Sequence, residues 1–387
     1  MTSVPSAEPT VRRGPSGFDV VVPSTPRIVS GVGTRSRVPE LLADLGATRT
    51  LLVTSPSMAA APVYREVVEA LGDSVVGRHE TVRPHAPMDD IRGLDAMFKT
   101  TRADSVVSVG GASVIDTTKA LVSLNPDRRC LHVTMPALFG GAEVTPFAGV
   151  TRSGEKHRLA GPELIPRVVV LDPAVPAALP IALTTTSLGN ALSHCVGGLF
   201  SVDANPVTDA LYLRAAELAA GAAVGLGGQP SLDALRDAQS ASVLAALLRV
   251  RMGIGHALVH AISPVLGCGH AATHAIVMRV VAHRRRTTLD ADRRRLLVNA
   301  LAGSAGTPSV SADGDALVES LTRFLNTVRI PLGLAGLGIT WDQVESALPR
   351  IDLAVRRDLE EAGGGESWAL EPILRSIWSG DLSARSG

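Results

Sequence analysis

This chain of 387 residues contains few aromatic residues and few cysteines, and it has no net charge. Phe, Trp and Tyr make up only 3% of it, which argues against a surface that stacks on nucleic-acid bases. Lys plus Arg equals Asp plus Glu at 37 each, so no net field attracts DNA or an anionic membrane. Uninterrupted apolar runs also stay shorter than a membrane-spanning helix. We therefore expect neither a nucleic acid nor a membrane as a partner.

The cysteine pattern and the first residues indicate a soluble, cytoplasmic protein. Cys130, Cys195 and Cys268 are far apart, odd in number and outside any CxxC motif, which favours a reducing compartment. Residues 1–17 contain no apolar segment of the signal-peptide type and are expected to form a disordered tail. The basic run at 283–286 is more typical of a solvated helix end than of a binding patch.

The order of apolar runs predicts two domains. Up to residue 178, short runs of Val, Ile and Leu alternate with helical patterns, which favours an α/β, Rossmann-like domain with a parallel sheet over 18–178. After Pro180 only helical periods follow, one of them unbroken across 233–263, so we predict an all-α catalytic domain over 179–387. We expect the chemistry in the cleft between these domains, since pockets favour domain interfaces. The runs typical of strands are 48–55, 105–111, 131–136 and 167–173.

Four histidines within nineteen residues are the most informative feature of the chain. His256 and His260 are four apart, as are His270 and His274, so each pair shares one face of a helix. The residues between them are largely apolar, and imidazoles are uncommon there unless they bind metal, move protons or meet polar partners. Core histidines with ordinary hydrogen bonds would explain a single position better than they explain four. We therefore expect a reactive site.

A glycine turn between an apolar strand and a helix is the second candidate site. Gly110 and Gly111 lack the Cβ that would block a close ligand, and the following helix N-terminus suits the pyrophosphate of a dinucleotide. Ser113 can supply a hydroxyl, and Asp116 or Lys119 can contact ribose or phosphate, although a solvent-facing pair explains them equally well. The turn is neither a GxGxxG fingerprint nor a Walker A loop.

Five segments in order resemble the iron-containing (group III) alcohol dehydrogenases, and most closely the maleylacetate reductase branch. The resemblance runs from about Phe18 to the C-terminus. It implies a nucleotide-binding domain, a helical domain, a homodimer and hydride exchange with NAD(P). The segments are GGASVIDTTK (110–119), PALFGGAEVTP (136–146), NALSHCVGG (190–198) followed by ANP (204–206), GHAATHA (269–275) and IPLGLAGLGI (330–339).

The resemblance also implies roles for individual residues. His260 matches a position beside the nicotinamide that serves in proton relay, and His274 matches a histidine of the maleylacetate reductase branch. The cofactor is expected at the glycine turn, at Ser55 after the first clear strand, and at Phe139. Ser55 stands where many relatives carry an Asp that repels a 2′-phosphate, so NADP is permitted beside NAD. The positions of the family's metal ligands are Asn190, His194, His256 and His270.

Asn190 stands where metal-dependent members have Asp. A neutral amide oxygen is a weaker ligand than a carboxylate, although three histidines alone hold zinc in some proteins. We favour a metal-free site over one with iron or zinc, as the maleylacetate reductase branch is regarded as metal-independent. Other departures are Ala137 and Leu138 in place of paired Thr, Gly197 in place of Glu, and the segment 278–280. These changes indicate a modified pocket.

The transferred hydride leaves negative charge on the substrate oxygen, which must be stabilised and protonated. Without a metal, we expect His256 and His270 to donate hydrogen bonds to that oxygen and His260 to act as general acid or base. Asn190 and His194 would then orient the substrate or the imidazoles. With a metal, His194, His256 and His270 would hold it as a Lewis acid. The sequence does not choose between these versions.

Three other functions remain open. One is an alcohol dehydrogenase that tailors a specialised metabolite or a modified peptide, including oxidation of a β-hydroxy acid with loss of CO₂; Gly197 and Gly198 would widen its pocket. Another is metal-dependent chemistry as in dehydroquinate synthase relatives, which need a basic cluster that this chain lacks near its histidines. The third is a non-catalytic binding relative, which predicts no NAD(P)H affinity.

Overall fold

The computed structural model describes residues 11–14, 17–20, 26–227, 231–302, 314–361 and 369–383. These residues form two compact units, which we call unit 1 and unit 2. Unit 1 contains 26–184 and 231–247. Unit 2 contains the other described residues, from 11–20 and from 185 onward.

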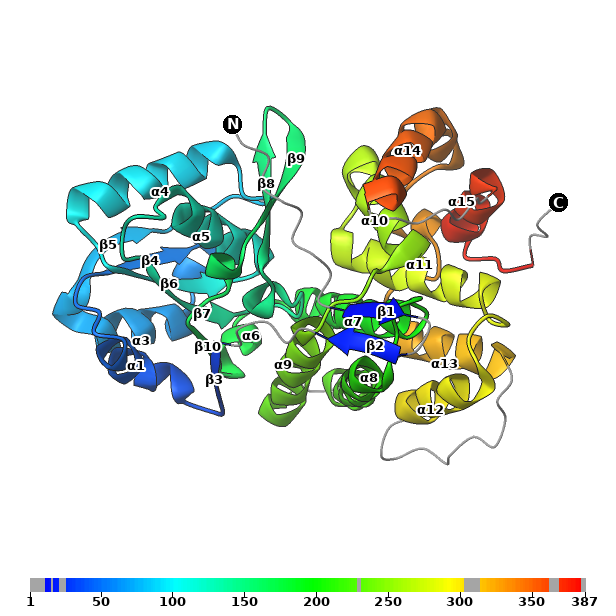
Figure 1. Cartoon of the computed structure of the whole chain (residues 1–387), viewed down its shortest axis with the longest axis horizontal. Coiled ribbons are helices and arrows are strands. Elements are labelled where there is room, and N and C mark those ends of the chain that lie inside the picture. Colours follow the sequence, from blue (N-terminus) through cyan, green and yellow to red (C-terminus); the bar gives the residue numbers. More distant parts are fainter. Residues whose placement is uncertain are drawn as a thin grey trace. The chain divides into compact units, whose positions relative to one another are not determined.

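Unit 1 is built on a six-stranded sheet in the order β3-β10-β7-β6-β4-β5, and every neighbouring pair is parallel (Figure 1). The four inner strands are buried along almost their whole length, as expected for a parallel sheet covered on both faces. The predicted α/β class is therefore confirmed. The strands are β3 (Arg27–Ser30), β4 (Thr50–Thr54), β5 (Val75–His79), β6 (Ser105–Gly110), β7 (Leu131–Pro136) and β10 (Val168–Leu171).

Helices cover both faces of this sheet, because successive residues of a strand point to opposite sides. In β6, Val107 packs in the same core as Leu41 and Tyr64, while its neighbour Val106 packs with Leu94 and Phe98. The helices of unit 1 are α1 (Val38–Asp44), α2 (Pro56–Ala59), α3 (Pro62–Leu71), α4 (Met88–Thr101), α5 (Ala112–Leu124), α6 (Ala174–Ala177) and α9 (Leu232–Leu247).

An antiparallel hairpin, β8 (Phe147–Arg152) with β9 (Glu155–Ala160), interrupts the alternation of strands and helices. We did not predict it. Its two-residue turn, Ser153-Gly154, has positive φ at both positions, the geometry that joins twisted strands most directly. The six residues of β9 are exposed or half-buried, so the strand carries little of the apolar alternation by which strands are found in a sequence.

Unit 2 is helical from residue 185 onward in its described part, as predicted. A small antiparallel sheet of β1 (Val11–Gly14) and β2 (Gly17–Val20) also belongs to it. No helix in the described part of the chain is long and apolar enough to cross a membrane. The helices are α7 (Ile181–Leu199), which begins in unit 1, α8 (Pro206–Leu226), α10 (Gly253–Leu266), α11 (His270–Arg284), α12 (Ala291–Ala302), α13 (Gly314–Thr327), α14 (Trp341–Glu361) and α15 (Leu370–Ser379).

Two expectations about chain organisation need correction. The helical pattern across 233–263 is not one helix: it divides into α9, which belongs to unit 1, and α10, which belongs to unit 2. Gly253, at the start of α10, has a φ of +62°, a left-handed conformation that interrupts the helix. Residues 11–14 of the expected tail form β1, whereas 1–10 lie outside the described residues.

Candidate active site: five histidines and a glycine turn

Three helices of unit 2 supply the histidine site. α7 carries Asn190 and His194, α10 carries His256 and His260, and α11 carries the remaining pair. α7 can approach α11 closely because Gly189 has no side chain: an added Cβ would lie 2.8 Å from Cβ of Ala275. Small residues at helix crossings allow such close contact, and this crossing sets the spacing between the histidines of the two helices.

The five imidazoles form one cluster. Ring centroids are 5.8 Å apart for His194 and His256, 5.4 Å for His194 and His274, and 5.3 Å for His256 and His274. These three residues each offer a ring nitrogen, and the three nitrogens lie within 4.8 Å of one another. His260 extends the cluster, with its ring 4.1 Å from that of His256, and His270 lies 4.6 Å from His274. The structure groups His274 with His194 and His256, whereas the ligand set implied by the resemblance contains His270, and that ligand assignment stays a prediction.

A chain of hydrogen bonds runs through the cluster. Nε2 of His270 and Nε2 of His274 are 3.2 Å apart, and Nδ1 of His274 lies 3.0 Å from Oγ of Ser193. That hydroxyl donates to the carbonyl oxygen of Asn190 at 2.7 Å. Ser193 was missed by sequence reasoning, although it lies directly before His194 in the motif; a serine on an apolar helix face carries no distinctive signal.

His260 has an acidic partner that the sequence did not reveal. Its Nδ1 lies 3.8 Å from Oδ2 of Asp358 on α14, and both side chains are more than a third exposed, at 40% and 36%. His260 therefore combines solvent access with a nearby carboxylate. A gap of 98 residues separates the two in sequence, which is why no local pattern could connect them.

Burial keeps the central imidazoles neutral. Desolvation lowers the pKa of His194, His256 and His274 well below the usual range for histidine. The charges of Arg249 and of the neighbouring histidines lower these pKa values further. A neutral imidazole offers one N–H donor and one lone pair, so the triad can orient a polar group or hold a metal.

Two buried atoms of the site have no hydrogen-bond partner among the described residues: Oδ1 of Asn190 and Nδ1 of His256. Buried polar atoms are seldom left in this state, and such atoms mark places where a ligand or a water completes the network. Three clustered imidazoles with a neutral amide beside them suit zinc less well than a set with a carboxylate, but they do fit a divalent ion.

The glycine turn of unit 1 has the shape of an anion cradle. A Cβ on Gly110 would lie 2.7 Å from Val114, and one on Gly111 would lie 3.0 Å from Cδ1 of Leu138, so a side chain at either position would crowd its neighbour. The N-terminus of α5 follows directly, with no capping side chain and no acidic residue in its first turn. The open amides of a helix N-terminus bind phosphate, so the turn fits a dinucleotide pyrophosphate.

Other residues predicted to bind the cofactor have protein partners. Oγ of Ser113 accepts a hydrogen bond from the His85 amide, and Oδ2 of Asp116 accepts one from the Gly149 amide, each at 3.0 Å. Lys119 is fully buried and donates to the carbonyl oxygens of Ala142, Thr145 and Phe147.

Asp116 and Lys119 are therefore bonded to the segment around β8, and neither belongs to a solvent-facing pair. Phe139 is 1% exposed, which leaves almost no surface for a cofactor, whereas Ser55 is half-buried directly after β4. The cofactor roles of Ser55, Ser113, Asp116, Lys119 and Phe139 stay predictions. Gly110, Gly111 and the first turn of α5 carry the geometric argument for the cofactor.

Comparison with known proteins identifies the family. The family of iron-containing alcohol dehydrogenases matches residues 25–173, and the C-terminal model of the same family matches residues 184–358. A maleylacetate reductase from Cupriavidus pinatubonensis is 32% identical over 361 residues, which cover 92% of this chain and 96% of that protein. The chain belongs to the iron-containing alcohol dehydrogenase family. The predicted resemblance, including the maleylacetate reductase branch, is thereby confirmed.

Solved structures of other reductases share the fold. Maleylacetate reductase from a Rhizobium species is 24% identical with a TM-score of 0.77, covering 92% of this chain and 97% of that one. Sulfoacetaldehyde reductase from Bifidobacterium kashiwanohense, solved in complex with NAD⁺, is 17% identical with a TM-score of 0.75, covering 85% and 91%. As a member of the iron-containing alcohol dehydrogenases, this chain is an NAD(P)-dependent oxidoreductase that acts on an alcohol or a carbonyl group.

Proposed function

We propose that this enzyme, a member of the maleylacetate reductase branch, uses NAD(P)H to reduce the carbonyl group of a small oxo acid. The observation that carries the proposal is the cluster of five histidines, three of them with a pKa lowered by desolvation, in a chain 32% identical to a maleylacetate reductase. The bound nicotinamide supplies the hydride. The side chains of the protein must then hold the carbonyl oxygen and deliver one proton to it.

We assign the proton to His260. It lies next to His256, its side chain is exposed to solvent, and a carboxylate lies 3.8 Å from its Nδ1, so Nε2 is the nitrogen left to act as the donor. In exchange with solvent, the exposed ring can be reprotonated after each turnover. His256 offers an N–H that can stabilise the charge developing on the oxygen.

We further propose that the reaction needs no metal. Asn190 in place of a carboxylate removes the strongest ligand from the set, while His194, His256 and His274 could still hold an ion weakly. Such an ion would act as a Lewis acid on the same oxygen. Elemental analysis of the purified enzyme, with turnover measured before and after chelation, distinguishes the two. Unchanged turnover without metal supports the proposal, and activity that requires added iron or zinc contradicts it.

Cofactor choice and substrate class are tested together. Fluorescence titration with NADH and NADPH measures both dissociation constants, and Ser55 leads us to propose that NADPH is accepted. A screen of oxo acids with the reduced cofactors, and of hydroxy acids and peptide alcohols with the oxidised ones, then gives the direction. Preference for an alcohol substrate would favour the tailoring dehydrogenase. If neither NADH nor NADPH binds at millimolar concentration, the proposal that this protein is an enzyme is refuted. We also propose a cytoplasmic homodimer, to be checked by light scattering and fractionation.

A further inference from the structure

The strand order of unit 1 marks one place on its sheet where a ligand is expected. From β4 the chain adds β5 on one side, and it then returns to place β6 on the other side of β4, with β7 and β10 beyond it. The order therefore reverses between β4 and β6. In open parallel sheets, ligands bind outside the carboxyl ends of the two strands at such a reversal. This topology and the glycine turn after β6 indicate the same place for the dinucleotide.

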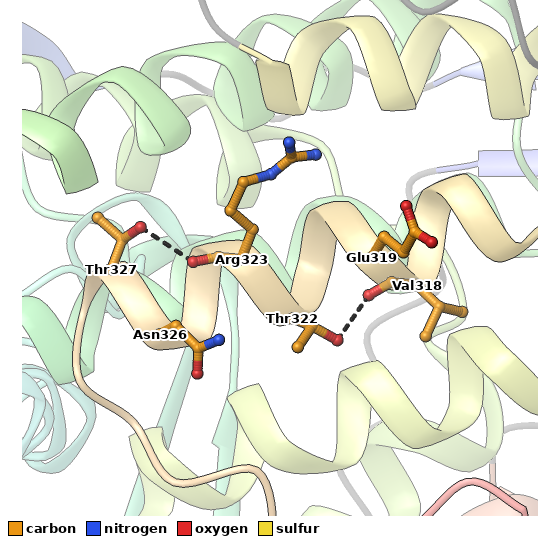
Figure 2. Close-up of a pocket in the computed structure, with 6 residues that line it drawn as sticks. All are labelled: Val318, Glu319, Thr322, Arg323, Asn326 and Thr327. Carbon is orange, nitrogen blue, oxygen red and sulfur yellow. Dashed lines mark hydrogen bonds between the residues drawn. The ribbon is translucent and has the colours of Figure 1, made fainter.

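A hollow of about 660 Å³ elsewhere in the chain has no such construction. All six residues that line this hollow come from α13 alone (Figure 2). Thr322 and Thr327 donate their hydroxyl protons to carbonyl oxygens of their own helix. A surface formed by one helix encloses nothing, so we give it no role.

The segment that joins β5 to α4, residues 80–87, crosses the carboxyl edge of the sheet at this reversal. We call it the edge segment. The Val82 amide donates to the carbonyl oxygen of Thr54, the last residue of β4, at 3.2 Å. The His85 amide donates to Oγ of Ser113, in the first turn of α5, at 3.0 Å. The edge segment thus runs from β5 past the end of β4 to the helix that follows β6, and all of these residues belong to unit 1.

His85 and Ala86 adopt a backbone conformation that residues with a side chain seldom adopt. Their φ angles are +67° and +46°, in the left-handed region that favours glycine. They are the one adjacent pair of non-glycine residues with positive φ in the described part of the chain. Thr151 of β8 holds them there: its hydroxyl donates to the carbonyl oxygen of His85 at 2.8 Å, and its amide donates to that of Ala86 at 3.1 Å. Strained residues of this kind cluster at active sites and ligand-binding sites.

The His85 side chain is available to a ligand. It is exposed, and its imidazole has no hydrogen-bond or ion-pair partner among the described residues. The two charged residues of the edge segment have partners elsewhere. Glu80 accepts a hydrogen bond from the Tyr64 hydroxyl at 3.0 Å, and the Arg83 guanidinium donates two to Oδ1 of Asp90 at 2.9 and 2.6 Å. The His85 backbone lies one hydrogen bond from the first turn of α5, so an anion held by that turn is within reach of the imidazole.

We propose that His85 binds the cofactor, with its imidazole donating a hydrogen bond to the diphosphate of NAD(P) at the glycine turn. The edge segment then serves to present this ring, which explains why the position carries a side chain where glycine would be free of strain. A ring nitrogen that donates to a charged oxygen forms one of the stronger hydrogen bonds in proteins. The inference rests on the proposed use of NAD(P)H and deepens it, because it adds a binding residue outside the glycine turn.

The test uses ADP-ribose, which contains the diphosphate of the cofactor, and adenosine, which lacks it. Calorimetric titration of the full-length protein gives the Kd of ADP-ribose, and displacement of ADP-ribose gives that of adenosine. His85→Ala is expected to weaken ADP-ribose by about tenfold and adenosine by less than about twofold. His85→Asn keeps an N–H donor and tolerates the left-handed conformation, so its loss should be smaller, about threefold. His157→Ala, which removes an exposed histidine of β9, is the matched control and should change neither Kd.

His85→Gly separates cofactor binding from backbone strain. It removes the imidazole and the strain together, so ADP-ribose should weaken by about tenfold while the Tm stays equal to or above that of the native protein. His85→Ala keeps the strain and should have the lower Tm of the two, because affinity follows the ring and stability follows the backbone. Native affinity in His85→Gly, or equal losses of ADP-ribose and adenosine in His85→Ala, overturn the inference. Absence of ADP-ribose binding by the native protein contradicts both this inference and the proposed use of NAD(P)H, whereas unchanged binding in the variants contradicts the inference alone.

Discussion

Nδ1 of His274 donates its proton to Oγ of Ser193, because that hydroxyl has already given its own proton to the carbonyl oxygen of Asn190. Nε2 of His274 therefore carries the lone pair, and the nearby Nε2 of His270 must be the donor of their 3.2 Å contact. The two hydrogen bonds fix the tautomer of His274 and place a proton on Nε2 of His270. His274 thus presents an acceptor, and not a donor, to the centre of the cluster.

Replacing Ser193 with Ala should release this tautomer. The buried Nδ1–H of His274 would lose its acceptor, which costs about 1 to 3 kcal/mol or shifts the proton to Nε2. We expect ¹⁵N chemical shifts of the imidazoles to report the changed tautomer and kcat to fall several-fold. Ser240→Ala, which removes a hydroxyl bonded to a helix carbonyl in the same way, is the control. An unchanged His274 spectrum would contradict the assignment.

Asp358→Asn should weaken proton delivery without affecting cofactor binding. The amide keeps the size of the side chain but removes the charge 3.8 Å from Nδ1 of His260. Partners that orient a reactive histidine are commonly worth about tenfold or more in activity, so we expect kcat to fall by about tenfold. Asp352→Asn, on the same helix and paired with Arg356, should leave kcat unchanged. Equal behaviour of the two variants would remove Asp358 from the mechanism.

The parts of the site that the sequence predicted are those with local signals. Histidines spaced four apart on apolar helices, and a glycine pair after an apolar strand, both follow from backbone periodicity. Asp358 and Ser193 could not be found this way, because each contacts a histidine on another helix: Asp358 lies near His260, and Ser193 bonds to His274. For the same reason, sequence order alone could not decide whether His270 or His274 completes the triad.

The crossing of α7 and α11 predicts a position intolerant of substitution. Gly189→Ala would place Cβ 2.8 Å from Cβ of Ala275 and 2.9 Å from Cδ1 of Ile330, forcing the helices apart. We expect the free energy of unfolding to fall by about 1 to 3 kcal/mol and turnover to fall with it. Gly221→Ala, in a helix with nothing within 4 Å, should instead stabilise by about 0.5 to 1 kcal/mol. Both values come from denaturant unfolding, and a tolerated Gly189→Ala would refute the tight crossing.

Asp116 should make stability depend on pH. Burial raises its pKa to about 6 from 3.8, although Lys119 lowers it in part. The folded state therefore binds this proton more tightly than the unfolded chain does, and the associated stability is present below about pH 4 and lost as pH rises through 6. Asp116→Asn keeps an acceptor for the Gly149 amide without a charge. We expect the difference in unfolding free energy between the variant and the native protein to grow from pH 4 to 7; a constant difference would contradict the raised pKa.

The fold was predictable to the extent that its elements carry periodic apolar residues. The strands of the parallel sheet and the helices of unit 2 do so, and both classes are confirmed. β9 does not, since all six of its residues are exposed or half-buried. The division of 233–263 was also hidden, because α9 and α10 each have helical periods and their separation depends on tertiary packing.

α9 gives unit 1 a piece that is remote in sequence. Gln239 on α9 donates to the carbonyl oxygens of Pro136 and Asp172, and Oγ of Ser242 accepts from the Gly141 amide. A gene fragment that stops at Thr184 would leave those buried carbonyl groups without their donor and uncover the apolar surface beneath the helix. Chimaeras between relatives therefore require at least three junctions, one after Thr184 and one on each side of α9, and a single exchange point would produce two incomplete halves.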